Sequence, residues 1–440
     1  MNSESFLDRA KRVIPGGIQS NYRKGALAPV YFKSANGVRL RTVEGQEFID
    51  YNLGSGPAIL GYENRHLTHA IESQNRELFN AMTSEVQVLA AEKIVEHVPC
   101  ADQVRFCVTG TEANANALRI ARAYTGRDKF VHFLGHYHGS TDEFVGGIVK
   151  DPSNPIACAG QIEGDVDSMF TNTEGRKTHA LEGKYRVQWN DLPALEELLA
   201  GYGDEIAAIM MEPSMTNWFG CLPEQGYLEG VRKLCDKYGI VLIFDEIVTG
   251  FRMDIGGAQQ RFGVIPDMCT LAKGVAGGIP VAVVCGKQNI MQKLVDNDVL
   301  IAGTYNGYAQ GMAAVIATIE ELERDNGAIY QSIEKHGNLL REGVLDIAQE
   351  LGMDDLRIQG FPACWNYFFH PKEKTINYAD SLDGWGNGMT KAARFVELML
   401  ENGVFTWTRF YTSAGHTEKE VNDALDRIRD SLKQLKSENL

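Results

Sequence analysis

The chain lacks the features that mark secreted, membrane-spanning and nucleic-acid-binding proteins. No apolar run in its 440 residues approaches the ~18 residues that cross a membrane. The segment Met1–Ala10 contains no apolar core of a signal peptide. Acidic residues outnumber basic ones, which gives a formal net charge of −15, whereas a nucleic-acid-binding surface needs clustered Lys and Arg. We therefore expect a protein that binds neither membranes nor nucleic acid.

Paired cysteines are also missing. The eight cysteines are scattered, and no two are spaced as C-x-x-C, so the sequence predicts neither a zinc site nor a disulfide framework. In a chain of this size we expect free thiols and a cytoplasmic location. His136 and His138 lie two positions apart without a set of acidic partners, and we predict no metal there.

Nucleotide-binding signatures are absent too, because the chain has neither a G-x-G-x-x-G motif nor a P-loop lysine. What the middle of the chain has is an alternation of strand-length apolar runs with helical patterns. The expected strands are Val104–Val108, Phe130–Leu134, Ile206–Met211, Ile240–Phe244, Met268–Ala272 and Val281–Cys285, and the expected helices are Glu112–Tyr124, Leu192–Leu199 and Tyr227–Tyr238. This alternation predicts an α/β fold with a mostly parallel sheet covered on both faces.

The pattern changes after about Gly307, where long helix-period segments follow. They are Ala309–Glu323, Ile329–Leu351, Met389–Asn402 and Thr417–Leu435. We predict a large domain over residues 51–307 and a smaller domain formed by residues 1–50 and 308–440. The polar segment Ser140–Val187 is long enough to be functional or mobile.

Two strand ends carry residues that suit catalysis. The run Ile243–Phe244 leads directly into Asp245 and Glu246, and ligands of parallel sheets bind beyond the carboxyl ends of the strands. Asp245 could pair with a cationic ring nitrogen of a cofactor, although solvated acids at a strand end are common. Lys273 ends the next apolar run and is followed by glycines. It is either a surface lysine or the partly desolvated amine that an aldehyde cofactor requires.

Two further segments suit a phosphorylated, flat cofactor. The run Val108-Thr109-Gly110-Thr111 leads into an Ala-rich helical segment, and a helix N-terminus can bind a phosphate. A plain N-cap at Thr111 is the alternative. At another strand end, Tyr137 lies between His136 and His138, where an aromatic ring could stack on a heterocycle.

Taken together, these residues resemble the class III aminotransferases of PLP fold type I, and among them most resemble the glutamate-1-semialdehyde aminomutases. The resemblance runs from Pro15-Gly16-Gly17 to Ala414–Glu418. It implies an α/β large domain with a sheet of the seven-stranded type, a smaller α+β domain, and a homodimer with shared active sites. It also implies pyridoxal 5′-phosphate (PLP) as the cofactor.

The resemblance assigns a role to each matching residue. Gly110 and Thr111 would bind the phosphate, with Thr304 reaching it from the partner subunit. Tyr137 and Ile247 would pack on opposite faces of the ring, and Asp245 would pair with its nitrogen. Lys273 would carry the cofactor as a Schiff base. The other positions implied to bind the cofactor are His138, Glu212 and Asn217.

Two arginines compete for a substrate carboxylate. Ser20 and Arg23 follow Pro-Gly-Gly at the spacing of the aminomutases, in which such an arginine binds the carboxylate. Arg409 lies in a shortened C-terminal stretch, Phe405–Phe410, that lacks the acid usual in aminomutases. The stretch Tyr305–Tyr308 is also bulkier than their pattern.

The function predicted from the sequence is a PLP-dependent aminotransferase that acts on a small-molecule amino donor and a keto or aldehyde acceptor. One substrate is expected to carry a carboxylate. The first alternative is an aminomutase, which moves the amino group within one molecule. A protein that binds PLP without catalysis is the second, and the joint presence of Lys273, Asp245 and Tyr137 argues against it.

Overall fold

The chain forms two compact units. Unit 1 comprises Met1–Arg65, Ile329–Lys374 and Gly384–Leu440, and unit 2 comprises His66–Ala328 and Thr375–Asp383. The computed structural model describes residues 3–20, 30–80, 82–145, 157–158, 174–177, 180, 182–296, 298–383 and 386–440. In the part of the chain described, no helix is long and apolar enough to cross a membrane.

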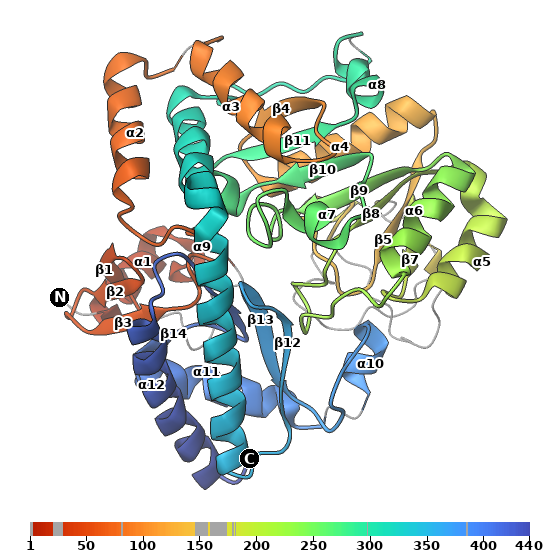
Figure 1. The fold of residues 1–440 in the computed structure, drawn as a ribbon. Coiled ribbons are helices and arrows are strands. Elements are labelled where there is room, and N and C mark those ends of the chain that lie inside the picture. Colours follow the sequence, from red (N-terminus) through yellow and green to blue (C-terminus); the bar gives the residue numbers. More distant parts are fainter. Residues whose placement is uncertain are drawn as a thin grey trace. The chain divides into compact units, whose positions relative to one another are not determined.

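Unit 2 is built around an eight-stranded sheet in the order β4-β11-β10-β9-β8-β5-β7-β6 (Figure 1). Its strands are β4 (Gln103–Cys107), β5 (Lys129–Phe133), β6 (Ala157–Cys158), β7 (Lys184–Val187), β8 (Ile206–Met211), β9 (Val241–Glu246), β10 (Met268–Leu271) and β11 (Ala282–Gly286). The pairs from β10 through β9, β8 and β5 to β7 are parallel, whereas β11 and the two-residue β6 run antiparallel to their neighbours. The mostly parallel α/β sheet predicted from the sequence is therefore confirmed.

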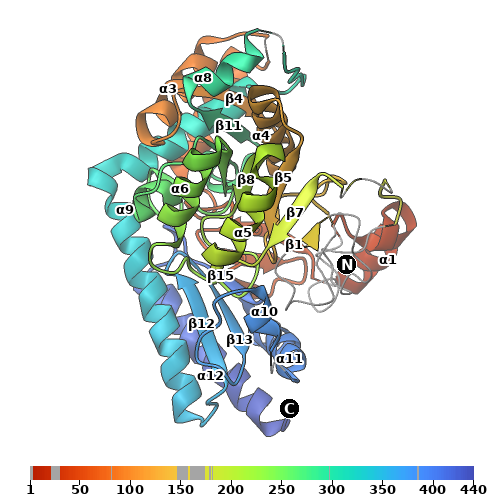
Figure 2. The same cartoon turned by 90° about the vertical axis from the view of Figure 1, so that its right-hand side faces the viewer.

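Unit 2 contains nine α-helical segments among its described residues, of which α4 to α7 connect strands of this sheet. They are α2 (Arg65–Glu77), α3 (Glu85–His97), α4 (Gly110–Thr125), α5 (Leu192–Tyr202), α6 (Tyr227–Tyr238), α7 (Gly257–Phe262), α8 (Gln288–Met291), the first part of α9 (Ala309–Glu350) and α10 (Tyr378–Leu382). Figure 2 shows α5 and α6 side by side on one face of the sheet. Helix α4 packs against β8, β9, β10 and β11.

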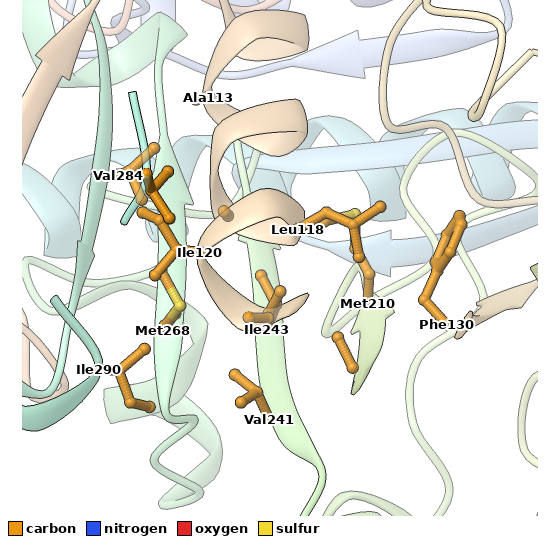
Figure 3. Packing of buried hydrophobic residues seen from close by; sticks show 14 of the residues in the cluster. Ala113, Leu118, Ile120, Phe130, Met210, Val241, Ile243, Met268, Val284 and Ile290 are labelled. Atoms are coloured by element: carbon orange, nitrogen blue, oxygen red, sulfur yellow. The ribbon is translucent and has the colours of Figure 1, made fainter. Parts of the chain in front are cut away.

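Helix α4 forms because its sequence is rich in alanine and has clear signals at both ends. The hydroxyl of Thr109 accepts a hydrogen bond from the Glu112 N–H at 3.2 Å, and Gly126 ends the helix with a φ of 70°. Its apolar face joins the central core, in which Leu118 and Ile120 point toward the strands (Figure 3). This packing fixes the first turn of α4 beside the carboxyl ends of the strands.

Unit 1 contains two smaller sheets and several helices. One sheet has the order β1-β2-β3-β14 and the other β12-β13-β15. Its elements are α1 (Ser3–Val13), β1 (Phe32–Asn36), β2 (Arg39–Thr42), β3 (Glu47–Asp50), the last part of α9, β12 (Leu356–Phe361), β13 (Cys364–Phe369), α11 (Gly388–Glu401), β14 (Val404–Phe405), β15 (Arg409–Tyr411) and α12 (Glu418–Ser437). Helix α11 packs against β13 and α12.

The chain passes between the units inside α9. Residues 324–327 depart from helical geometry, and Asp325, Asn326 and Gly327 have φ between 52° and 73°. The sequence predicts this break, because the two helical patterns Ala309–Glu323 and Ile329–Leu351 leave a gap there. Most of the polar segment Ser140–Val187 lies outside the described residues.

Candidate active site

A pocket of about 220 Å³ opens in unit 2 where β9 and β10 end and α4 begins. It is lined by Gly110, Thr111, Asn114, Tyr137, His138, Gly139, Glu212, Asn217, Asp245, Ile247, Val248, Ala272 and Lys273. Every residue that the sequence predicts for the cofactor lies here except Thr304, which is exposed. The sheet topology explains why these residues lie together, because the carboxyl ends of parallel strands lie at the same edge of the sheet.

Asp245 is the charged centre of this pocket and is only 3% exposed. Its Oδ2 lies 2.7 Å from His138 Nδ1 and accepts a hydrogen bond from Asn114 Nδ2 at 2.7 Å, while Oδ1 accepts one from the Ile247 N–H at 3.0 Å. Thr270 Oγ1 in turn donates to Asn114 Oδ1 at 2.6 Å. This network of hydrogen bonds fixes the orientation of the buried carboxyl group.

Asn114 and Thr270 are missing from the residues predicted from the sequence. Asn114 lies one helical turn after Gly110, on the side of α4 that faces the sheet. Side chains alternate between the two faces of a strand, and on β10 the side chain of Thr270 lies on the face that α4 covers. The available signal was a polar side chain at an otherwise apolar, buried position in each element. Such a residue needs a partner, but its identity depends on which elements pack together.

Lys273 has an unusual backbone conformation. It follows Ala272 at the end of β10 with a φ of 46°, in the left-handed region that non-glycine residues rarely adopt. Strain of this kind costs about 1–3 kcal/mol and persists where the surroundings enforce it, often at functional sites. The lysine lies in the pocket wall together with Asp245.

The first turn of α4 forms another part of the wall. Because Thr109 is the N-cap, Gly110 and Thr111 lie in the first turn of the helix, where backbone N–H groups have no intrahelical acceptor. The alternative of an N-cap at Thr111 is therefore wrong. Together with the helix dipole, this turn suits a phosphate.

Two glycines make room for this arrangement. A Cβ on Gly139 would lie 2.5 Å from Thr111 Oγ1, and Gly139 has a φ of 120°. A Cβ on Gly110 would lie 2.9 Å from Ile247 Cδ1. Glycine at both positions therefore lets α4, the loop after β5 and Ile247 approach one another at the pocket.

Glu212 organises the side of the pocket that carries Tyr137. Its Oε1 accepts hydrogen bonds from the Tyr137 N–H and from Asn217 Nδ2, both at 2.8 Å, and Oε2 accepts one from Thr216 Oγ1 at 2.8 Å. Burial, with a further contribution from Asp245, raises the pKa of Glu212 above its ordinary value. The hydrogen bonds fix Tyr137 and Asn217 at the pocket.

Two of the residues predicted to bind substrate, Ser20 and Arg409, belong to unit 1 and are not among the described residues that line this pocket. Arg23, the third, lies outside the described residues. Arg409, on β15, donates from Nη1 to Tyr411 Oη at 2.8 Å. Their roles stay predictions.

Comparisons with known proteins show the family of the chain. The family model described as aminotransferase class-III matches residues 21–432. Two glutamate-1-semialdehyde 2,1-aminomutases are similar over nearly the whole chain. The one from Methanococcoides burtonii is 36% identical, with 98% of this chain and 99% of the relative covered. The one from Ignicoccus hospitalis is 37% identical, with 97% of each covered.

Two solved structures resemble this one closely. An omega-transaminase from Sphaerobacter thermophilus superposes with a TM-score of 0.88 at 27% identity, over 99% of this chain and 98% of that one. A glutamate-1-semialdehyde aminomutase from Pseudomonas aeruginosa superposes with a TM-score of 0.85 at 26% identity, over 98% and 94%. The same fold thus serves transfer between two molecules and transfer within one.

Proposed function

The chain belongs to the class III aminotransferase family, and we propose that it moves an amino group from a donor to a separate keto or aldehyde acceptor. Its cofactor is pyridoxal 5′-phosphate. One observation carries the proposal: a single pocket combines a buried Asp245, a strained Lys273 and the first turn of α4.

The residues of the pocket fit PLP. The first turn of α4 would hold the phosphate, and Gly139 leaves the space that this approach needs. Tyr137 and Ile247 would pack on the two faces of the ring, and Asp245 would pair with the ring nitrogen. When bound, PLP supplies an aldehyde for the substrate amine and an electron-withdrawing cationic ring.

The side chains of the pocket have separate roles in the proposed reaction. Asp245 holds a proton on the ring nitrogen, because a carboxylate only 3% exposed favours a cation beside it. Asn114 and His138 keep that carboxylate in place. Lys273 Nζ accepts the proton from the substrate Cα and returns it, which requires its neutral form. A substrate carboxylate would be bound by an arginine, for which Arg23 is the first candidate.

A purified holoenzyme tests this function through the visible absorbance of its bound cofactor. An amino donor should bleach that absorbance, and a keto or aldehyde acceptor should restore it. Lys273→Ala should abolish turnover while the cofactor remains bound without a covalent link. Lys287→Ala removes a lysine paired with Asp267, which precedes β10 at the strand end opposite Lys273, and it should keep normal turnover. Normal turnover by Lys273→Ala would overturn the mechanism.

The second candidate is an aminomutase, and the names of the relatives at 36% and 37% identity favour it. A mutase needs no separate donor or acceptor. Incubation with glutamate 1-semialdehyde alone distinguishes the two functions, because a mutase converts it completely to the isomer. If that conversion is fast while all donor and acceptor pairs fail, the mutase replaces our first proposal.

A homodimer in the cytoplasm completes the proposal. The family resemblance gives Thr304 to the partner's site, and in keeping with this Thr304 is exposed and outside its own chain's pocket. Seven cysteines in the described part are buried thiols, as in proteins from reducing compartments. Sedimentation over a range of concentrations would test the dimer, and a monomer at all concentrations would contradict it.

A further inference from the structure

Three cysteines that are far apart in the sequence converge in unit 2. Cys269 lies on β10, Cys285 on β11, and Cys100 in the loop between α3 and β4. All three sulfur atoms lie within 4.8 Å of one another, and the Sγ atoms of Cys269 and Cys285 are 3.2 Å apart. The cluster is separate from the pocket, to which none of the three contributes.

The register of the sheet creates this cluster. Cys269 and Cys285 are direct partners in the antiparallel pairing of β10 with β11. Their neighbours Met268 and Val284 belong to the core beneath α4, and side chains alternate along a strand. The two thiols therefore point to the opposite face of the sheet. Cys285 also pairs in register with Val104 on β4, close in sequence to the loop that carries Cys100.

Hydrogen bonds hold the third cysteine at the cluster. The backbone N–H of Cys100 donates to Gln259 Oε1 at 2.9 Å, and Gln259 Nε2 donates to Glu246 Oε1 at 3.0 Å. Gln259 belongs to α7, so this helix is tied to the loop of Cys100 and to the end of β9. All three cysteines are at most 2% exposed. The cluster is thus rigidly framed and shielded from solvent.

Three converging sulfur atoms suit a soft metal ion, since thiolates select copper(I) and zinc over hard cations. Zinc in structural sites takes four ligands, whereas the cluster in the described part of the chain offers three. Copper(I) accepts three thiolates in a plane. Buried cysteines can also pack simply as small apolar side chains, and this alternative predicts no metal binding.

We propose that Cys100, Cys269 and Cys285 form a three-coordinate site for copper(I) in unit 2. The ion links β10, β11 and the loop before β4. Cys269 lies four residues before Lys273, so the site braces the strand that ends at the catalytic lysine. Since the site is buried, the ion enters during folding or through an opening of its covering elements.

Copper content of the holoenzyme tests the proposal by two routes. The protein is purified from cells grown with added copper, and separately titrated with copper(I) without oxygen against a competing chelator. We expect one bound copper per chain and a rise in melting temperature on binding. Loss of even an outer-shell partner typically lowers metal affinity about 10- to 100-fold, so Cys100→Ala, Cys269→Ala and Cys285→Ala should each lower it by about 100-fold or more.

Cys235→Ala is the matched control, because Cys235 is equally buried in unit 2 but lies on α6 outside the cluster. It should bind copper like the wild type. Retained cofactor absorbance shows that a variant has folded, and if the strand variants do not fold, the loop variant Cys100→Ala decides the matter. Absence of copper by both routes, or equal copper binding by the folded cluster variants, would overturn the proposal.

Discussion

Asp245 and Glu246 are adjacent buried acids with opposite surroundings. Asp245 faces α4 and Asn114, whereas Glu246 points to α7 and accepts hydrogen bonds from the Ala258 N–H and Thr249 Oγ1. Burial raises the pKa of Glu246 to about 7. Asp245 therefore lines the pocket, whereas the carboxyl group of Glu246 caps the short helix α7 on the other side of the sheet.

This difference predicts the effects of two matched substitutions. Asp245→Asn removes the charge that keeps the cofactor's ring nitrogen protonated, so deprotonation at the substrate Cα should slow by about 100-fold or more. Glu246→Gln leaves that charge in place and should change the rate by far less. Single-turnover kinetics with substrate deuterated at Cα measures this step. Equal rates for Asp245→Asn and the wild type would contradict the assigned role.

A second residue-scale prediction concerns Asp50 in unit 1. Burial raises its pKa from 3.8 to about 6, although the Leu53 and Asn52 N–H groups and the Tyr62 hydroxyl donate hydrogen bonds to it. We therefore expect the native state to bind a proton at Asp50 more tightly than the unfolded state does, and the contribution of Asp50 to stability to fall by about 3 kcal/mol as pH rises from about 4 to 6. Asp50→Asn should abolish this part of the pH dependence, as measured by unfolding at each pH.

Asp423 provides the control with the opposite sign. Its pKa lies below the ordinary value because, against the effect of burial, Arg427 and Arg39 stabilise the charged form. The stability that Asp423 contributes is present at neutral pH and lost as pH falls through its folded-state pKa. Asp423→Asn should therefore flatten the acid side of the stability profile. If Asp50→Asn had the same effect, the burial argument would be wrong.

At the scale of elements, the glycines at the two ends of α4, Gly110 and Gly126, are required for different reasons. Gly110 lies against Ile247, and an added Cβ would crowd its side chain at 2.9 Å. Overpacking costs about 1–3 kcal/mol, so Gly110→Ala should weaken cofactor binding about tenfold or more. Gly126, at the C-terminal end, has a φ of 70° and open space around its Cβ position. Gly126→Ala should cost about 1 kcal/mol of stability and leave cofactor affinity unchanged.

Equilibrium release of the cofactor from the two variants, followed by absorbance, distinguishes these effects. An equal loss of affinity in both would mean that the helix acts through its overall stability and not through its first turn.

The strands and helices of unit 2 could be predicted where the pattern was local. The runs that became β8 and β10, and the gap that became the break within α9, followed from periodicity alone. The sequence analysis did not predict strand β7, because Lys184 and Arg186 give the segment the polar pattern of an exposed loop. Both side chains are buried in the structure. In unit 1, β14 and β15 were missed because they are only two and three residues long, and β14 pairs with β3, which is distant in sequence.

For the whole molecule, the sequence predicted a set of residues that the fold brings together from separate strands, and nine of the ten residues predicted to bind the cofactor line one pocket. Asn114 and the cysteine cluster were not foreseen, because both depend on how distant elements face one another across the sheet. The predicted division into a large domain over residues 51–307 and a smaller domain from the flanking segments stays a prediction. The two compact units of the structure begin and end at other residues, such as His66 and Ala328.

The last prediction concerns the substrate carboxylate, for which Arg23 and Arg409 compete. Arg409 already donates to the hydroxyl of Tyr411, whereas the family resemblance gives the carboxylate to Arg23. Losing the charged partner of a bound carboxylate costs about 2–5 kcal/mol, roughly thirtyfold or more in affinity, and losing a residue that only packs nearby costs about 1 kcal/mol. Arg23→Ala should therefore raise KM for a carboxylate substrate far more than Arg409→Ala.

An amine donor without a carboxylate serves as the internal control, because its KM should hardly respond to Arg23→Ala. Tyr411→Phe, which removes the hydroxyl that holds Arg409, should leave both KM values nearly unchanged. The opposite ranking of the two arginines would transfer the role to Arg409. Because the aminomutase pattern places its carboxylate-binding arginine at the position of Arg23, that result would also favour transfer between two molecules over transfer within one.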